Sequence, residues 1–231
     1  MWSLSPAETE ALLLSLKVAF WSVAASLPAA VALAWVLSRL SFPGKSLLDA
    51  VVHLPLVLPP VVVGYFLLIL FGRRGPIGAF LDEYLGITFA FRWTGAALAF
   101  AVTGFPLLVR AVRQSLDAVD RGLESAAATL GAPPVWVFAS VTFPLILPGV
   151  VTGMLLSFAR SLGEFGATIT FVSNIPGETQ IISAAIYTLT QVPGGDAAAL
   201  RLVVISIMIS LAALVVSEWL ARRATARLHG L

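Results

Sequence analysis

Residues 11–37 read ALLLSLKVAFWSVAASLPAAVALAWVL, and Lys17 is the only charged residue among them. A helix needs about 20 apolar residues to cross the hydrocarbon core of a bilayer, which is about 30 Å thick. This stretch is long enough, and it exceeds the apolar core of about 7–15 residues in a cleaved secretory signal. The preceding residues, MWSLSPAETE, contain two glutamates and no basic residue, whereas such a signal begins with positive charge. We therefore interpret the stretch as a retained transmembrane helix.

The composition of the whole chain favours the same environment. Of its 231 residues, 59% are hydrophobic and 11% are charged, and the mean hydropathy is +0.97. A soluble domain carries roughly 25% charged residues, so this chain has too few to cover a water-facing surface of its size. Its net charge of +2 is small and does not indicate nucleic-acid binding. The class predicted is integral membrane protein.

The sequence contains few residues that could form a catalytic, cofactor or metal site. The chain has no cysteine, and its two histidines, His53 and His229, are far apart. We find no nucleophile with an adjacent base, no paired-carboxylate site and no zinc motif. PGKS at 43–46 ends like a phosphate-binding loop, but Arg39 stands where that loop requires glycine. We predict no enzyme activity, cofactor or metal, so any use of ATP requires a partner.

Further apolar stretches bring the predicted number of transmembrane helices to about five. The spans are expected at about 12–37, 51–71, 94–112, 145–172 and 200–220. Helices are expected because a barrel requires alternating strands of about 10 residues. The fold class predicted is therefore an all-α integral membrane protein with one domain, residues 1–231.

Two of these spans contain breaks. In the fourth, Gly163 and Gly166 predict a shorter helix followed by a bent segment. The second contains helix-bending residues, which are Pro55, Pro59, Pro60 and Gly64. Such a bend is either a static kink needed for packing or part of a helix that lines a solute pathway or flexes as it opens.

Basic residues predict the orientation, because cytoplasmic loops are enriched in lysine and arginine. An odd number of spans places the two termini on opposite sides of the membrane. One side receives Arg39, Lys45, Arg110, Arg113, Arg121, Arg222, Arg223 and Arg227. The other receives Lys17, Arg73, Arg74, Arg92 and Arg201, diluted by acidic residues. The N-terminus is therefore expected outside and the C-terminus in the cytoplasm.

Residues 113–143 connect the third and fourth spans and lie in the cytoplasm in this topology. Apolar residues recur at 3- and 4-residue steps from Leu116 to Leu130, which favours an amphipathic helix. Gly131 is expected to stop this helix, and the Pro-Pro pair that follows favours a new helix start. Two short helices would form a compact knob. It either packs over the ends of the spans or fits a socket on a soluble partner.

This knob resembles the cytoplasmic motif of ABC-importer permeases. The motif reads Glu-Ala-Ala, three residues, Gly, nine residues, Ile, one residue and Leu-Pro. The residues at the motif positions are Ser125, Ala126, Ala127, Gly131, Val141, Phe143 and Pro144. Ser125 replaces the motif's glutamate, and Glu124 precedes it by one residue. The resemblance implies that residues 113–143, which we call the coupling segment, dock on an ATP-binding subunit and transmit its motion.

Three longer stretches resemble the permeases of bacterial molybdate ABC importers. They are residues 41–65, 86–93 and 159–179. Sulfate permeases share a Gly-Glu-Phe-Gly-Ala-like segment, but SNIPGET at 173–179 and the short chain favour molybdate. The resemblance implies a multi-pass permease in the bacterial inner membrane, surrounded by lipid. It also implies a homodimer that works by alternating access with two copies of the ATP-binding subunit and an extracytoplasmic molybdate-binding protein.

Alternative functions are a sulfate or tungstate permease of the same family, an ion-gradient-driven transporter and a scaffold without transport. An ion-gradient transporter is expected to have more intramembrane carboxylates or two related halves, and we see no internal repeat.

One intramembrane pair of charges stands out. Arg160 and Glu164 are four residues apart, so they can pair on one helical face. Charges at membrane depth are usually paired or functional. The pair is either a salt bridge that holds the bent fourth span or part of the pathway or its gate.

Overall fold

The computed structural model describes residues 4–229, and these form helices without any β-strand. In chain order the elements are α1 (Pro6–Arg39), α2 (Lys45–Val57), α3 (Pro60–Phe71), α4 (Pro76–Leu85), α5 (Trp93–Ala118), α6 (Arg121–Thr129), α7 (Pro134–Val137), the π-helical turn η1 (Phe138–Thr142), α8 (Phe143–Leu162), α9 (Gly166–Val172), α10 (Ile182–Thr190) and α11 (Asp196–His229). The predicted all-helical fold is confirmed.

Within the described residues, four helical stretches are long and apolar enough to cross a membrane. They are α1, α5, Pro134–Leu162 and Asp196–Leu220. The pair α2 and α3 passes the same test only when both helices are taken together. Counted as one broken span, this pair brings the total to the predicted number of about five.

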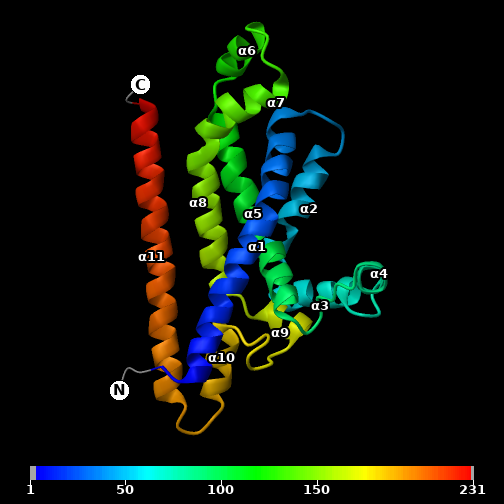
Figure 1. Ribbon diagram of the computed structural model, residues 1–231, viewed down its shortest axis with the longest axis vertical. Helices are drawn as coiled ribbons and strands as arrows, with labels where there is room; N and C mark the ends of the chain where they lie inside the picture. The colour runs from blue at the N-terminus through cyan, green and yellow to red at the C-terminus, as the bar shows by residue number, and fades with distance from the viewer. Residues whose placement is uncertain (1–3, 230–231) are drawn as a thin grey trace.

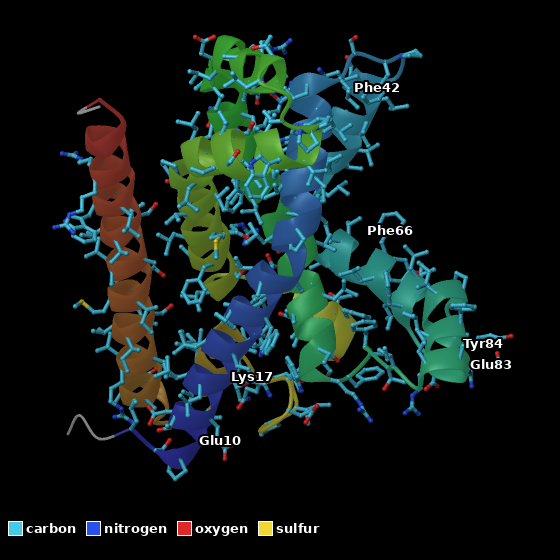
Figure 2. All side chains as sticks on the ribbon, turned by 45° about the horizontal axis from the view of Figure 1, so that its top comes forward. Glu10, Lys17, Phe42, Phe66, Glu83 and Tyr84 are labelled. Carbon is cyan, nitrogen blue, oxygen red and sulfur yellow. The ribbon has the colours of Figure 1, made fainter. Side chains whose placement is uncertain are left out.

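Helices α1, α5 and α8 form the centre of the molecule, and α11 runs along α8 (Figure 1). The elements α6 and α7 lie at the same end as the C-terminus, and α9, α10 and the N-terminus lie toward the other (Figure 1). Figure 2 shows Phe42, in the α1–α2 connection, near the first end and Glu10 at the second. We call the first end the knob end.

Small residues allow α5 and α8 to pack closely, as is common where membrane helices meet. A Cβ atom added at Gly149 would clash with the Ser115 side chain, and one added at Gly104 would clash with Ser157. Two apolar clusters fill the interior, and both include residues of α5 and α8. One surrounds Phe100 and Phe171, and the other, nearer the knob end, surrounds Leu37, Leu108 and Ile146.

The N-terminus of α1 is tied to α11 by an ion pair. Two nitrogens of Arg201, Nε and Nη2, lie 3.1 and 2.9 Å from Glu8 Oε1. Glu8 also takes part in a capping box, because its Oε2 accepts the Ser5 N–H while its own N–H donates to Ser5 Oγ. First and last helices are thereby held together at the end opposite the knob.

The stretch predicted as one span over 51–71 differs from that expectation, because α2 and α3 meet at 113°. Leu58 and Pro59 between them are both extended, with ψ angles of 144° and 132°. A residue that precedes proline is driven out of the helical region, and Pro59 and Pro60 impose this on two residues in succession. Pro55 lies inside α2 without ending it. The helix α3 and the following α4 therefore extend away from the bundle, as Phe66, Glu83 and Tyr84 show in Figure 2.

The stretch predicted as the fourth span, 145–172, is divided between α8 and α9. Residues 163–165 form the break, and a Cβ at Gly166 would lie 2.8 Å from Pro60 Cβ. The break therefore lies against the start of α3.

Gly64 lies within α3, beyond the bend, and faces α9. A Cβ atom there would lie 2.8 Å from Ala167 Cα and 2.9 Å from Thr170 Cβ. We expect Gly64→Val to destabilise the protein by about 1–3 kcal/mol through overpacking, which corresponds to a loss of about 5 °C in Tm. Thermal unfolding in detergent measures this.

The matched control for Gly64→Val is Gly163→Ala. Gly163 has a negative φ of −90°, and an added Cβ would meet only the Arg160 carbonyl oxygen at 3.8 Å. Its Tm is expected to stay within about 1 °C of the unsubstituted protein. An equal Tm loss in both variants would contradict the assignment of Gly64 to the α3–α9 contact.

Candidate functional site

The coupling segment begins on the last turns of α5, which continues beyond the predicted span to Ala118. The amphipathic helix expected over 116–130 is interrupted at Val119 and Asp120. Asp120 caps a new helix, α6, because its Oδ1 accepts the Gly122 N–H at 2.8 Å. Leu116 is buried in the bundle as a result, whereas Leu123 on α6 is half exposed.

Gly131 forms the corner between α6 and α7. Its φ is +86°, in the left-handed region that favours glycine, and its N–H donates to the Ala128 carbonyl at 3.0 Å. The Ala132 N–H donates to the Ala127 carbonyl at 3.4 Å. Pro134 then starts α7, so the chain reverses direction within a few residues.

The tip of this corner is apolar and exposed. Leu130 is 89% exposed and Val135 80% exposed, and Trp136 on the same turn of α7 is also largely exposed. Isolated exposed apolar side chains are common, but three large ones within seven residues of one turn indicate a contact surface. Ser125 and Ala126 are exposed on α6 nearby.

One face of α6 contacts the bundle instead. Only Glu124 and Ala127 are partly buried on this helix. Glu124 Oε1 accepts hydrogen bonds from Arg39 Nη2 at 3.0 Å and from Thr142 Oγ1 at 2.7 Å. Arg39 ends α1, and Thr142 ends η1, so the carboxylate joins three elements.

The sequence offers no signal that Arg39 and Thr142 belong to this site. Arg39 and Glu124 are 85 residues apart, and no local pattern connects them. The motif's remaining residues lie in η1 and the first turn of α8, where the chain returns to the bundle. Val141 is half-buried in η1, Phe143 packs beside Phe138 with ring centroids 6.2 Å apart, and Pro144 lies in the first turn of α8.

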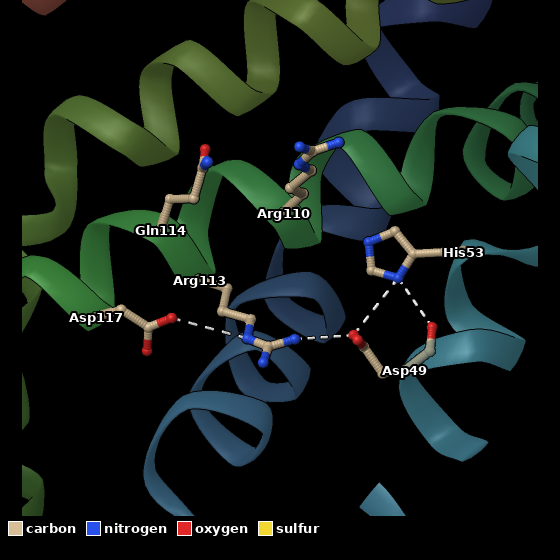
Figure 3. A pocket seen from close by; sticks show the side chains of 6 residues that line it. All are labelled: Asp49, His53, Arg110, Arg113, Gln114 and Asp117. Atoms are coloured by element: carbon tan, nitrogen blue, oxygen red, sulfur yellow. Dashed lines mark hydrogen bonds and ion pairs between the residues drawn. The ribbon is translucent and has the colours of Figure 1, made fainter. Parts of the chain in front are cut away.

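A cavity of about 300 Å³ lies between α2 and α5 (Figure 3). Arg113 lies between two carboxylates there, with Nη1 2.8 Å from Asp49 Oδ1 and Nε 3.8 Å from Asp117 Oδ2. His53 Nδ1 lies 2.8 Å from the Asp49 carbonyl oxygen. Arg110 and Gln114 complete the lining. Two aspartates offset two arginines, so this cavity has no surplus of positive charge for a doubly charged anion.

Arg160 and Glu164 form an ion pair, with Nη1 and Oε2 2.9 Å apart. The Glu164 side chain is 1% exposed and lies past the end of α8, in the break before α9. Its Oε1 accepts the Ala167 N–H at 3.0 Å, and its carbonyl oxygen accepts the Ser183 hydroxyl at 2.6 Å. One residue thus connects α8, α9 and the start of α10.

Lys17 lies over the ring of Trp93, with Nζ 3.8 Å from the ring centroid. Among the described residues, no group of three histidine, aspartate or glutamate side chains is placed to hold a metal ion. The residues of PGKS form the turn into α2, with Gly44 at its N-cap.

Comparison with known proteins gives a consistent result. Residues 26–226 match the family described as binding-protein-dependent transport system inner membrane component. The molybdenum transport system permease protein ModB of Escherichia coli K12 is 60% identical over 219 residues, covering 95% of this chain and 96% of that protein. Its counterpart in Haemophilus influenzae is 55% identical over 216 residues, covering 94% of both chains. The sulfate transport system permease protein CysT of Salmonella typhimurium is 42% identical over 159 residues, covering 69% of this chain and 57% of its own length.

Solved structures show the same fold at low sequence identity. A bacterial ABC transporter that imports alginate aligns with a TM-score of 0.72 at 16% identity, covering 95% of this chain and 80% of that one. The inward-facing MetNI methionine ABC transporter aligns with a TM-score of 0.67 at 18% identity, covering 97% of both.

Proposed function

The chain belongs to the binding-protein-dependent transport system inner membrane component family and is a multi-pass ABC-transporter permease of the inner membrane, and on this premise we propose that it imports molybdate. A separate ATP-binding subunit drives the transport, and an extracytoplasmic binding protein delivers the oxyanion. The identity of 60% to a molybdenum permease over nearly the full length supports this substrate more strongly than the 42% match to a sulfate permease over part of it.

The single observation that supports ATP coupling is the exposed apolar corner of the coupling segment. Leu130 follows α6 and Val135 lies in α7, and both side chains are exposed. These two elements lie at the end of the molecule that we call the knob end (Figure 1). Burying such side chains against a partner is favourable by about 25 cal/mol per Å² of apolar area. We place this end in the cytoplasm, in keeping with the basic residues there, and the ATP-binding subunit covers it. Hydrolysis then occurs entirely on that subunit.

The proposed assembly contains two copies of this chain. α2 has no buried residue, and its last residue, Val57, is 82% exposed. α3 and α4 also expose many large apolar side chains, including Tyr65, Phe66, Phe80 and Tyr84. A second copy packed against these helices would cover part of this surface and enclose a pathway between the two. Each copy would bind one ATP-binding subunit.

Alternating access in this proposal uses the break at Leu58 and Pro59. α2 is held to α5 by the Asp49–Arg113 ion pair, whereas α3 packs on α9. The two halves of the broken span are therefore attached to different parts of the molecule, so closure of the ATP-binding subunits can move one relative to the other. Pro59 and Pro60 maintain the break in both states.

Substrate selection is proposed to reside in the binding protein. A divalent oxyanion is costly to desolvate unless donors replace its water. The cavity between α2 and α5, in which the arginine and aspartate charges offset each other, does not meet that requirement. We therefore expect a wide, weakly binding passage rather than a tight molybdate site in the permease.

Reconstitution in proteoliposomes tests the proposal. Molybdate uptake is expected only when the ATP-binding subunit, ATP and the molybdate-binding protein are all present, and it should persist when a protonophore collapses the proton gradient. Tungstate and sulfate are added as competitors with the matched binding protein. Uptake that survives removal of ATP but not of the gradient would establish an ion-gradient transporter, and preferential sulfate uptake would establish the related substrate.

A further inference from the structure

Glu124 is the only charged side chain of α6 that turns toward the bundle. Its side chain is 22% exposed, whereas Arg121 and Ser125 on the same helix are exposed. The motif of this family has its glutamate at the position of Ser125, one residue later. A step of one residue turns a side chain by about 100° around a helix, so the carboxylate here lies on a different face from the motif position.

The partners of Glu124 belong to the membrane bundle. Arg39 is only 10% exposed and ends α1, and Thr142 is buried at the end of η1. Both donate to the same oxygen, Oε1. Among the described residues, Glu124 is the one carboxylate that forms an ion pair with this guanidinium. Arg39 Nε is buried there without a hydrogen-bond partner.

We propose that Glu124 is a positioning residue, not a docking residue: with Arg39 and Thr142 it locks the coupling segment to α1 and to the entry of α8, so that motion of the ATP-binding subunit reaches the membrane helices. This inference rests on the proposed function. A second lock lies beside the first and joins α1 to α5: Ser38 Oγ donates a hydrogen bond to Asp117 Oδ1. The two locks join the end of α1 to both sides of the coupling segment.

The physical consequence is a separation of binding from coupling. The exposed corner around Leu130 binds the partner and does not need the lock. The helical backbone is interrupted on both sides of α6, at Val119 and at Gly131. Without the lock, α6 can shift at these two interruptions, so that part of the partner's motion is lost within the coupling segment. Removing a charge-assisted hydrogen bond costs more than removing a neutral one.

The test compares Glu124→Gln with Leu130→Asp in the reconstituted transporter. Glu124→Gln is expected to bind the ATP-binding subunit with unchanged affinity and to lower the molybdate imported per ATP hydrolysed by roughly tenfold, the factor that 1.4 kcal/mol represents. Leu130→Asp is expected to weaken binding of the subunit instead, because a charge then replaces the exposed apolar contact. Thr142→Val, which changes no charge, should shift the same ratio in the same direction as Glu124→Gln, by a smaller factor.

A spectroscopic measurement separates loss of the lock from general instability. The chain has no cysteine, so Ser41→Cys and Ser125→Cys, both at exposed positions, attach two spin labels specifically. The distance distribution between the labels should broaden in Glu124→Gln. Replacing both partners, as Arg39→Glu with Glu124→Arg, should narrow it again and restore part of the coupling.

The outcomes distinguish this inference from the proposed function. If the unsubstituted complex shows no ATP-dependent molybdate uptake, the proposed function fails. If it does transport, and Glu124→Gln keeps its import per ATP or loses its affinity for the ATP-binding subunit, the positioning role is overturned. Should Glu124→Gln fail to accumulate, Thr142→Val decides the question by the same two measurements.

Discussion

Replacing Gly131 by proline is expected to reduce ATP-driven molybdate uptake by at least roughly tenfold while the membrane spans remain inserted. Gly131 has a φ of +86°, and proline is confined near −65°. Proline would also remove the N–H that donates to the Ala128 carbonyl. A backbone forced into an unfavourable region costs about 1–3 kcal/mol, so the corner would adopt another path in most molecules. ATP hydrolysis and uptake are measured together, because uncoupling lowers only the second.

The control for this prediction is Gly131→Asn. A Cβ at Gly131 meets no atom within 4 Å, so the substitution tests mainly the backbone conformation. Asparagine tolerates the left-handed region better than most residues other than glycine, and it retains its N–H. It should therefore keep most of the uptake. Undiminished coupled transport in Gly131→Pro would show that the corner does not transmit motion.

The contrast between these two substitutions also separates the two interpretations of the knob. A loop that only covers the ends of the spans would tolerate a changed corner, because no partner protein has to fit against the residues at its tip. A docking element would not, because the direction in which Leu130 and Val135 extend depends on the corner. Co-purification of the ATP-binding subunit with each variant measures this directly.

The parts of this fold that sequence reasoning predicts well are local in the chain. Hydropathy over about 20 residues identifies α1, α5, α8 and α11, because the bilayer imposes one length on each. Gly131 predicts the end of a helix, because a left-handed termination depends on the one residue that adopts it. The proline pair at 59 and 60 predicts a bend but not its angle of 113°, which depends on where α3 finds its packing partner α9.

The contacts that a single sequence does not reveal are those between distant residues. The Arg39–Glu124 pair and the Glu8–Arg201 pair join residues 85 and 193 positions apart. The close contact of Gly64 with Ala167 is of the same kind, because these residues are distant in the chain and no local pattern predicts that α3 and α9 pack there. Glu124 was selected because it lies beside a motif, and only the structure shows that its carboxylate faces inward.

Replacing Arg160 by leucine is expected to destabilise the protein by about 3 kcal/mol. Glu164 is 1% exposed and would keep a buried charge without its partner, and breaking a buried pair from one side typically costs about 3–5 kcal/mol. We take the lower figure because the Arg160 side chain is 35% exposed. In a chain of this size the change corresponds to a loss of about 8 °C in Tm, which thermal unfolding in detergent measures.

The double variant Arg160→Leu with Glu164→Gln decides what the pair does. Glutamine removes the charge but keeps an oxygen that can accept the Ala167 N–H at the start of α9. If the pair holds the break between α8 and α9, the double variant should regain more than half of the lost Tm, and its uptake should recover with its stability. If Arg160 serves the pathway or its gate, stability would return and uptake would not. A Tm unaffected by Arg160→Leu would rule out the structural role, because a carboxylate this deeply buried has no other cation within reach in the described structure.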